Sequence, residues 1–160
     1  MAAELATWFL AGFCVSLFHE LGHATAARFL RWPFALIRIG VGPLLFRLGA
    51  LEIRVLPFGG VIRMPEPPRA TATIILWGGL LTSAFTGTAF TLAFFLTGQQ
   101  FLFLFAVAVL SIVGFVFNLD PGIPGSDGHH LFGPRPKARA WARQGVFLLI
   151  LITIAAIYKP

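Results

Sequence analysis

Long apolar runs separated by short polar stretches dominate the chain. Four of them are expected to form helices, at residues 5–29, 70–97, 101–119 and 142–158. A helix needs about 20 residues to cross the hydrocarbon core of a bilayer, and the first three runs meet that length. The fourth run is shorter and spans only if Trp141 and Arg143 lie at the interface. The pattern predicts an all-α, multi-pass membrane protein with about four transmembrane helices.

A different pattern occupies residues 34–64, between the first two apolar runs. Apolar and charged residues alternate with a period of two over Leu51–Val55, which is typical of a strand with two unlike faces. Gly49-Ala50 can turn one strand back on another. We therefore expect a small β-hairpin or sheet at the membrane surface, inserted between the first and second helices.

Composition supports a membrane protein and limits its organisation. Of the 160 residues, 58% are hydrophobic and 11% are charged, whereas a soluble domain has about 25% charged residues. The length predicts a single core domain over residues 1–160. Cys14 is the one cysteine, which excludes an intrachain disulfide.

Positive charge is confined to a few loops. The net charge is +6, and nearly all basic residues lie between the first and second or the third and fourth apolar runs. The positive-inside rule places both loops in the cytoplasm and both termini outside, in a plasma or inner membrane. Because the basic residues are spread out and do not cluster with exposed aromatic residues, the charge indicates orientation in the bilayer and not nucleic-acid binding.

The first apolar run contains an unusual polar group in the stretch "FHELGHATAAR". This run has an acid and no basic residue ahead of it, and a discarded signal peptide has no use for buried histidines, so we expect a retained helix. His19 and His23 are four residues apart and lie on one face of a helix, where both can ligate one metal ion. Glu20 then lies near the open coordination position and can take a proton from water.

The same group of residues admits two other interpretations. Such residues can form hydrogen bonds between helices, although ionisable groups in membrane segments are costly and rare. A histidine-box iron enzyme needs more histidines than the four in this chain. The metal-dependent hydrolase is favoured over both.

A catalytic zinc site takes three protein ligands and leaves the fourth position for water. The candidate for the third ligand is Asp127, in the stretch "FNLDPGIPGSDGHHLF" after the third apolar run. A stretch broken by proline and glycine must line a cavity or pack on protein if it lies at membrane depth. A plain interfacial loop with a solvated aspartate is the alternative, and His129 and His130 compete with Asp127 as ligands.

Three motifs together resemble the site-2 protease family of intramembrane zinc metalloproteases, over roughly Phe13–Leu131. They are HELGH, then PFGG at Pro57–Gly60, then Asn-x-x-Pro followed by Asp-Gly. The resemblance implies one Zn²⁺ per chain and proteolysis of a partner's transmembrane segment within the lipid bilayer. It implies these roles: zinc ligands His19, His23 and Asp127; general base Glu20; substrate contacts Asn118, Pro57, Gly59 and Gly60.

The resemblance also extends to the Arg38–Val61 region, which is similar to the membrane-associated β-structure that receives an extended substrate. The chain departs from the pattern after Asp127-Gly128, where His129 and His130 replace a further glycine. A non-catalytic membrane protein that binds metal or membrane helices is the second functional interpretation. The intact Glu20 argues against it, because metal binding alone does not need this carboxylate.

Overall fold

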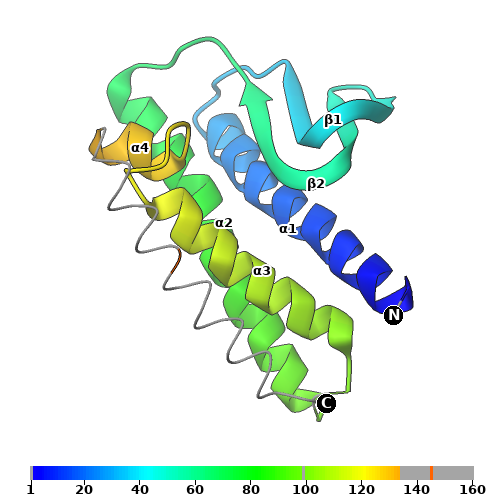
Figure 1. Cartoon of the computed structure of the whole chain (residues 1–160). Helices are drawn as coiled ribbons and strands as arrows, with labels where there is room; N and C mark the ends of the chain where they lie inside the picture. The colour runs from blue at the N-terminus through cyan, green and yellow to red at the C-terminus, as the bar shows by residue number, and fades with distance from the viewer. Residues whose placement is uncertain (1, 99, 134–144, 146–160) are drawn as a thin grey trace. The chain divides into compact units, whose positions relative to one another are not determined.

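The structure is a computed structural model that describes residues 2–98, 100–133 and 145 (Figure 1). The chain divides into two compact units, Met1–Gly114 and Phe115–Pro160, which are described separately. The elements follow one another as α1 (Ala2–Phe29), β1 (Leu36–Leu48), β2 (Leu51–Arg63), α2 (Arg69–Leu96), α3 (Leu102–Leu119) and α4 (Asp127–Phe132).

Among the described residues, three helices are long and apolar enough to cross a membrane. They are α1 and α2, with 28 residues each, and α3, with 18. A helix satisfies its backbone hydrogen bonds internally, which is why such apolar runs form helices in lipid. Three of the four expected spans are thereby confirmed close to their expected bounds. The fourth, residues 142–158, lies outside the described residues apart from Gly145.

The loop between α1 and α2 forms the expected β-hairpin. Strands β1 and β2 pair antiparallel, and Leu48 pairs with Leu51 across the turn at Gly49-Ala50. The register shifts several times between Ile37 and Phe46, so the ladder is interrupted by bulges. The part of the chain that the structure describes is therefore helical with one small two-stranded sheet.

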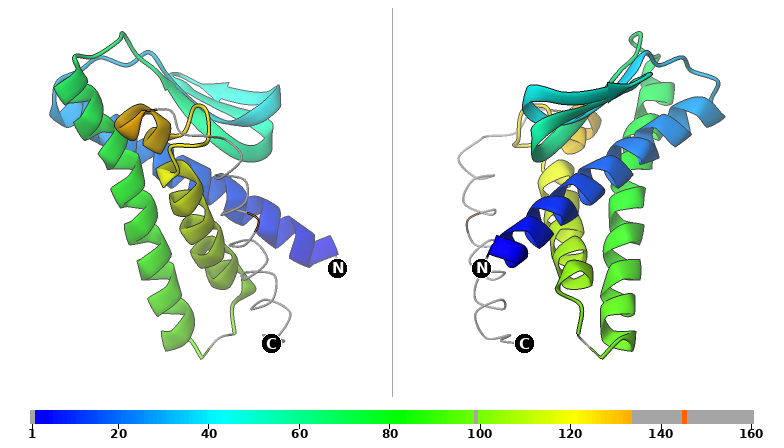
Figure 2. Two further views of the ribbon diagram at one scale, coloured as in Figure 1. Left: turned by 60° about the vertical axis from the view of Figure 1, so that its left-hand side comes forward. Right: turned by 90° about the vertical axis from the view of Figure 1, so that its right-hand side faces the viewer.

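Helix α1 lies between the hairpin and α2 in the first unit (Figure 2). On one side, Ala24 of α1 packs with Ile37 and Ile39 of β1. On the other side, Gly22 of α1 meets Gly78 of α2 so closely that neither position has room for a Cβ atom. Small residues allow this close approach of helix backbones in a membrane, where no hydrophobic force drives helices together.

A second packed cluster joins α1 to α3. Ala11 and Val15 of α1 contact Ala106 and Val107 of α3, and aromatic side chains surround them. Large apolar side chains such as Phe85 remain exposed on the outer faces of the helices, as expected for surfaces that face lipid.

The second unit begins in the last turn of α3 and continues through a hydrogen-bonded loop into α4. The hydroxyl of Ser126 donates to the carbonyl of Asp120 over 2.7 Å and accepts from the backbone N–H of His129 over 3.0 Å. Ser126 is therefore the N-cap of α4. Asp127 begins this short helix, which sequence periodicity did not predict.

Candidate metal centre

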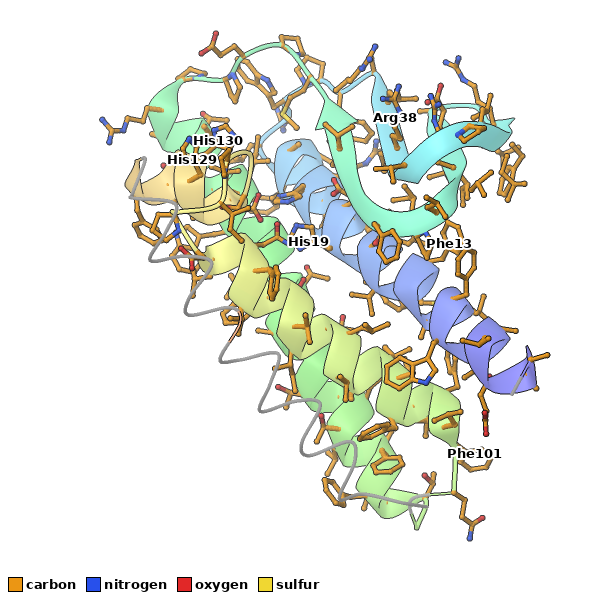
Figure 3. All side chains as sticks on the ribbon, viewed as in Figure 1. Phe13, His19, Arg38, Phe101, His129 and His130 are labelled. Atoms are coloured by element: carbon orange, nitrogen blue, oxygen red, sulfur yellow. The ribbon has the colours of Figure 1, made fainter. Side chains whose placement is uncertain are left out.

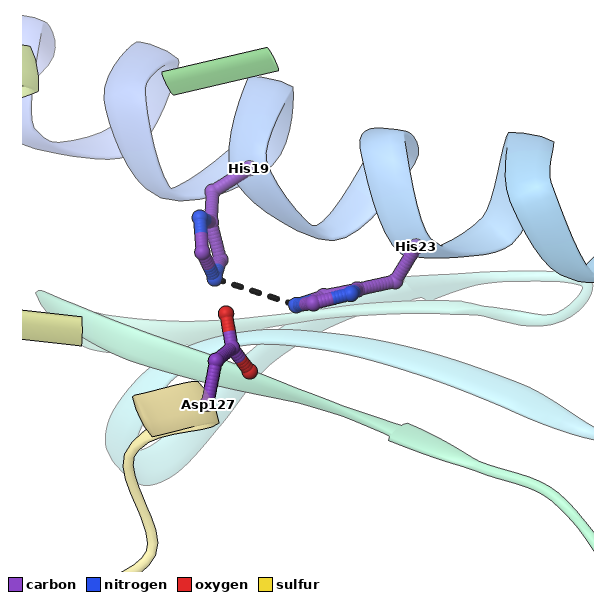
Figure 4. A group of neighbouring side chains, drawn as sticks. All are labelled: His19, His23 and Asp127. Carbon is purple, nitrogen blue, oxygen red and sulfur yellow. Dashed lines mark hydrogen bonds between the residues drawn. The ribbon is translucent and has the colours of Figure 1, made fainter. Parts of the chain in front are cut away.

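His19 and His23 lie one turn apart on α1 with their rings turned toward each other. Their Nε2 atoms are 3.1 Å apart (Figure 4). Both side chains are buried. Figure 3 shows His19 on the helix and Arg38 out on the hairpin. The expected juxtaposition of the two imidazoles is present.

The ring of His23 is fixed by a backbone carbonyl of α2. Its Nδ1 atom lies 2.7 Å from the carbonyl oxygen of Ile75. A carbonyl only accepts hydrogen bonds, so Nδ1 carries the proton and the neutral ring presents a lone pair at Nε2. This is the tautomer that a histidine ligand requires when it binds metal through Nε2.

The ring of His19 contacts α2 through a side chain. Its Nδ1 atom lies 2.8 Å from the hydroxyl oxygen of Ser83. A hydroxyl both donates and accepts, so this contact by itself is compatible with either tautomer of His19.

The spacing of the two nitrogens fits a metal ion. Zinc–nitrogen bonds of about 2.0–2.1 Å in tetrahedral geometry place two nitrogen ligands about 3.3 Å apart. The observed Nε2–Nε2 separation is 3.1 Å. With the lone pair of His23 directed into this gap, the pair suits a soft-to-borderline cation such as Zn²⁺.

Glu20 is buried beside the histidine pair and is covered by the hairpin. A Cβ atom built on Gly60 of β2 would lie 2.6 Å from Oε1 of Glu20. Only glycine allows the strand to approach the carboxylate this closely. The hairpin therefore brings an extended backbone directly against the predicted general base.

The other two predicted substrate contacts on the hairpin have different surroundings. A Cβ atom built on Gly12 of α1 would lie 3.2 Å from the ring of Pro57, so this ring packs closely on the glycine. The Pro57 carbonyl accepts a hydrogen bond from Ser16 over 3.3 Å. Gly59 has a positive φ of 68°, and no heavy atom outside its neighbouring residues lies within 4 Å of the place where a Cβ atom would be. Pro57 thus anchors the hairpin on α1, and Gly59 turns the strand between Pro57 and Gly60.

Sequence reasoning missed the contribution of α2. Ile75, Gly79 and Ser83 follow one another at intervals of four residues, so they lie on one face of the helix. All three are buried, and each borders one of the histidines. The sequence signal in this region is the run WGGLLTSAFTGTAFT, whose small residues indicate close helix packing but no contact with the histidines.

The remaining predicted site residues belong to the second unit. Asn118 is half-buried near the end of α3, and Asp127 is buried in the first turn of α4. The Nδ1 atom of His129 lies 3.1 Å from the carbonyl of Pro121, whereas His130 is exposed. The roles of Asn118 and Asp127 in the site stay predictions.

Two buried imidazoles with an intervening carboxylate, on a helix apolar enough to cross a bilayer, are the arrangement expected of a metallohydrolase that acts within a membrane. The family model of Peptidase family M50 matches residues 8–102, and the chain belongs to this family, the site-2 proteases. M50 is a family of zinc-dependent metalloproteases, and the three apolar helices agree with an integral membrane protein. No curated protein matches the chain. The matched residues include HELGH and the hairpin and end before Asn118 and Asp127.

Proposed function

We propose that the protein is an intramembrane zinc endopeptidase that hydrolyses a peptide bond in or near a transmembrane segment of another membrane protein. One observation carries the proposal: the buried side chains of His19 and His23 present Nε2 atoms 3.1 Å apart on a helix of membrane-spanning length. Glu20 lies between them in the sequence, beneath an extended strand. Metal binding alone needs neither this carboxylate nor the strand.

The proposed ligands are His19, His23 and Asp127, drawn in Figure 4, with one Zn²⁺ per chain. Each offers one ligand atom, and all three are buried. A carboxylate with two imidazoles is a common ligand set of catalytic zinc, and it partly neutralises the charge of the ion. When bound, zinc supplies Lewis acidity and lowers the pKa of a water molecule to about 7.

Glu20 is proposed as the general base. Its carboxylate takes a proton from the attacking water and then gives it to the leaving amine. Burial supports this role, because a carboxylate in a membrane helix costs free energy and is retained where it has a function. The backbone of Gly60 packs against the carboxylate of Glu20 and limits the positions that this carboxylate can take.

The hairpin is proposed to hold the substrate. A transmembrane helix hides its peptide bonds in its own hydrogen bonds, so the cleaved stretch has to unwind. An unwound stretch can add to a sheet edge as a further strand, and β2 passes directly over Glu20. Asn118 is proposed to hold the substrate backbone, together with Pro57, Gly59 and Gly60.

We also place both basic loops, and with them the active site, toward the cytoplasm. The support is the distribution of arginine and lysine, since Lys159 is the one basic residue outside these loops. HELGH lies in the second half of α1, toward the basic loop that follows it. A reporter after α1 is therefore expected on the cytoplasmic side.

Glu20→Gln tests the function. We expect the variant to bind one zinc per chain and to lose cleavage of a model transmembrane substrate, because the amide keeps the shape and cannot accept the proton. Zinc content and cleavage are measured on the same preparation, with Glu66→Gln as the control, since Glu66 is exposed in the loop beyond β2. Cleavage by Glu20→Gln near the wild-type rate contradicts the mechanism. Zinc binding with no cleavage by the wild-type protein favours the non-catalytic alternative.

A further inference from the structure

One face of α2 is built around the two histidines of α1. The backbone carbonyl of Ile75 contacts Nδ1 of His23, and the hydroxyl of Ser83 contacts Nδ1 of His19. Between them, Gly79 leaves the space that the ring of His23 fills. Ile75 and Ser83 are eight residues apart, or about two turns, with Gly79 midway, so all three lie on the face of α2 that meets the histidines.

The hydroxyl of Ser83 differs from those of four threonines on the same helix. Thr73, Thr82, Thr88 and Thr91 each donate to the carbonyl four residues before them. This local bond is the usual arrangement for a hydroxyl in a membrane helix. Ser83 instead has its oxygen 2.8 Å from Nδ1 of His19, across the helix interface and 64 residues away in the sequence.

The direction of this hydrogen bond decides what His19 presents to His23. If Nδ1–H of His19 donates to Ser83, the neutral ring carries its lone pair at Nε2, as the ring of His23 does. If Ser83 donates instead, the proton of His19 lies at Nε2 and donates to Nε2 of His23 across the 3.1 Å gap between the rings. A metal ion can occupy the gap only in the first case.

We propose that Ser83 is a positioning residue of the metal centre, whose hydroxyl accepts from Nδ1–H of His19 and turns the Nε2 lone pair toward the ion. The proposal rests on the proposed function in one respect, namely that His19 and His23 are the zinc ligands. It assigns to α2 a role beyond packing. Ile75 orients one ligand through its backbone, which mutation cannot remove, and Ser83 orients the other through a side chain, which mutation can remove.

The test compares two substitutions of equal shape in the full-length protein in detergent. Ser83→Thr keeps a hydroxyl, and Ser83→Val replaces it by a methyl group. We expect Ser83→Val to bind zinc about 10–100-fold more weakly than Ser83→Thr, the usual range for loss of a group that orients a histidine ligand. Zinc affinity is measured by competition with a chromophoric chelator, and the visible spectrum of the cobalt(II)-loaded protein reports the ligand geometry. We expect the spectrum to change in Ser83→Val and to be kept in Ser83→Thr.

Ser111→Ala is the matched control, because Ser111 is fully buried in α3 among apolar residues. It should bind zinc as the wild type does. Equal zinc affinity of Ser83→Thr and Ser83→Val, whether high or low, overturns the proposal and leaves Ser83 a packing residue. His19→Ala and His23→Ala separate this failure from failure of the proposed function. If either variant retains wild-type zinc affinity, the ligand set itself is wrong.

Discussion

Gly60 of β2 faces the carboxylate of Glu20 with no space between them for a side chain. A Cβ atom on residue 60 would lie 2.6 Å from Oε1 and 2.7 Å from Cδ of Glu20. Residues 40 positions apart in the sequence are thus in direct contact. The contact ties the position of the predicted base to the position of the strand.

The first prediction concerns this contact. Gly60→Ala should displace either β2 or the carboxylate, because a methyl group cannot fit between them. A misplacement of about 1 Å in a catalytic site can lower the rate about 100-fold, and we expect a loss of that order in kcat. Zinc affinity should stay near the wild-type value, since the substitution touches neither histidine. Cleavage assays and zinc titrations on the same preparation measure both.

Val61→Ala is the control for Gly60→Ala, because Val61 is the next residue of the strand and its side chain is exposed. It should change cleavage only slightly. If Gly60→Ala cleaves as the wild type does, the strand does not constrain Glu20. If it loses zinc as well, the hairpin is needed for the integrity of the whole centre.

The second prediction concerns Gly79. A Cβ atom at this position would overlap the imidazole of His23, whose ring is held in place by the carbonyl of Ile75. Gly79→Ala should therefore push the ring away from the metal position and weaken zinc binding by at least about tenfold. Gly114→Ala is the control, because its Cβ atom would meet Val15 at an ordinary 3.9 Å. Equal zinc affinity in the two variants would show that the ring of His23 can move without cost to the site.

The helices and the hairpin were predictable because their signals are local. Apolar runs of membrane length identified α1, α2 and α3, and period-two alternation with a glycine turn identified the hairpin. Helix α4 was not predicted, because its six residues, Asp127–Phe132, are too few to show a helical period. Its N-cap, Ser126, was present in the sequence, but a lone serine among prolines and glycines indicates a turn as readily as a helix.

The sequence predicted only those parts of the site whose residues lie close together along the chain. His19, Glu20 and His23 occupy one turn of one helix, so the motif alone placed the imidazoles together. The contacts of Ser83 with His19 and of Gly60 with Glu20 depend on how α1 packs against α2 and the hairpin. Nothing in a single sequence distinguishes Ser83 from the other hydroxyl residues of α2, so its role required the structure.

The third prediction concerns the stability of the hairpin against acid. Glu52 of β2 accepts hydrogen bonds from Arg38 over 3.1 Å and from Arg54 over 3.2 Å. The hydrogen bond from Arg38 has the largest effect, and the two bonds together lower the pKa of the Glu52 carboxyl below its ordinary value. A carboxylate whose pKa is lowered by folding stabilises the folded state above its unfolded pKa, and this stabilisation disappears as the pH falls through the folded pKa. The hairpin should therefore loosen as the pH drops below about 4.

Amide hydrogen exchange in β1 and β2, corrected for the intrinsic pH dependence of exchange, measures this effect. Wild-type protection should fall on acidification below about pH 4, and Glu52→Gln should have low protection that does not change over the same range. Glu66→Gln should behave as the wild type, because Glu66 is exposed outside the hairpin. An unchanged pH profile in Glu52→Gln would assign the acid sensitivity to another group.

The last prediction decides the third zinc ligand among three residues of α4. Asp127 is buried in the first turn, His129 directs Nδ1 to the carbonyl of Pro121 over 3.1 Å, and His130 is exposed. Zinc accepts a third histidine as readily as a carboxylate, so ligand chemistry alone does not choose. Burial favours Asp127, because a buried carboxylate is stabilised by a cation, whereas an exposed imidazole is already solvated. Asp127→Ala should therefore lose most of the bound zinc, and His129→Ala and His130→Ala should keep it.

Zinc content per chain and chelator competition on the three variants measure this loss of zinc, and Asp127→Asn shows whether the charge or the shape of the side chain matters. If His129→Ala or His130→Ala loses the metal while Asp127→Ala retains it, the third ligand is a histidine and the assignment of Asp127 is wrong.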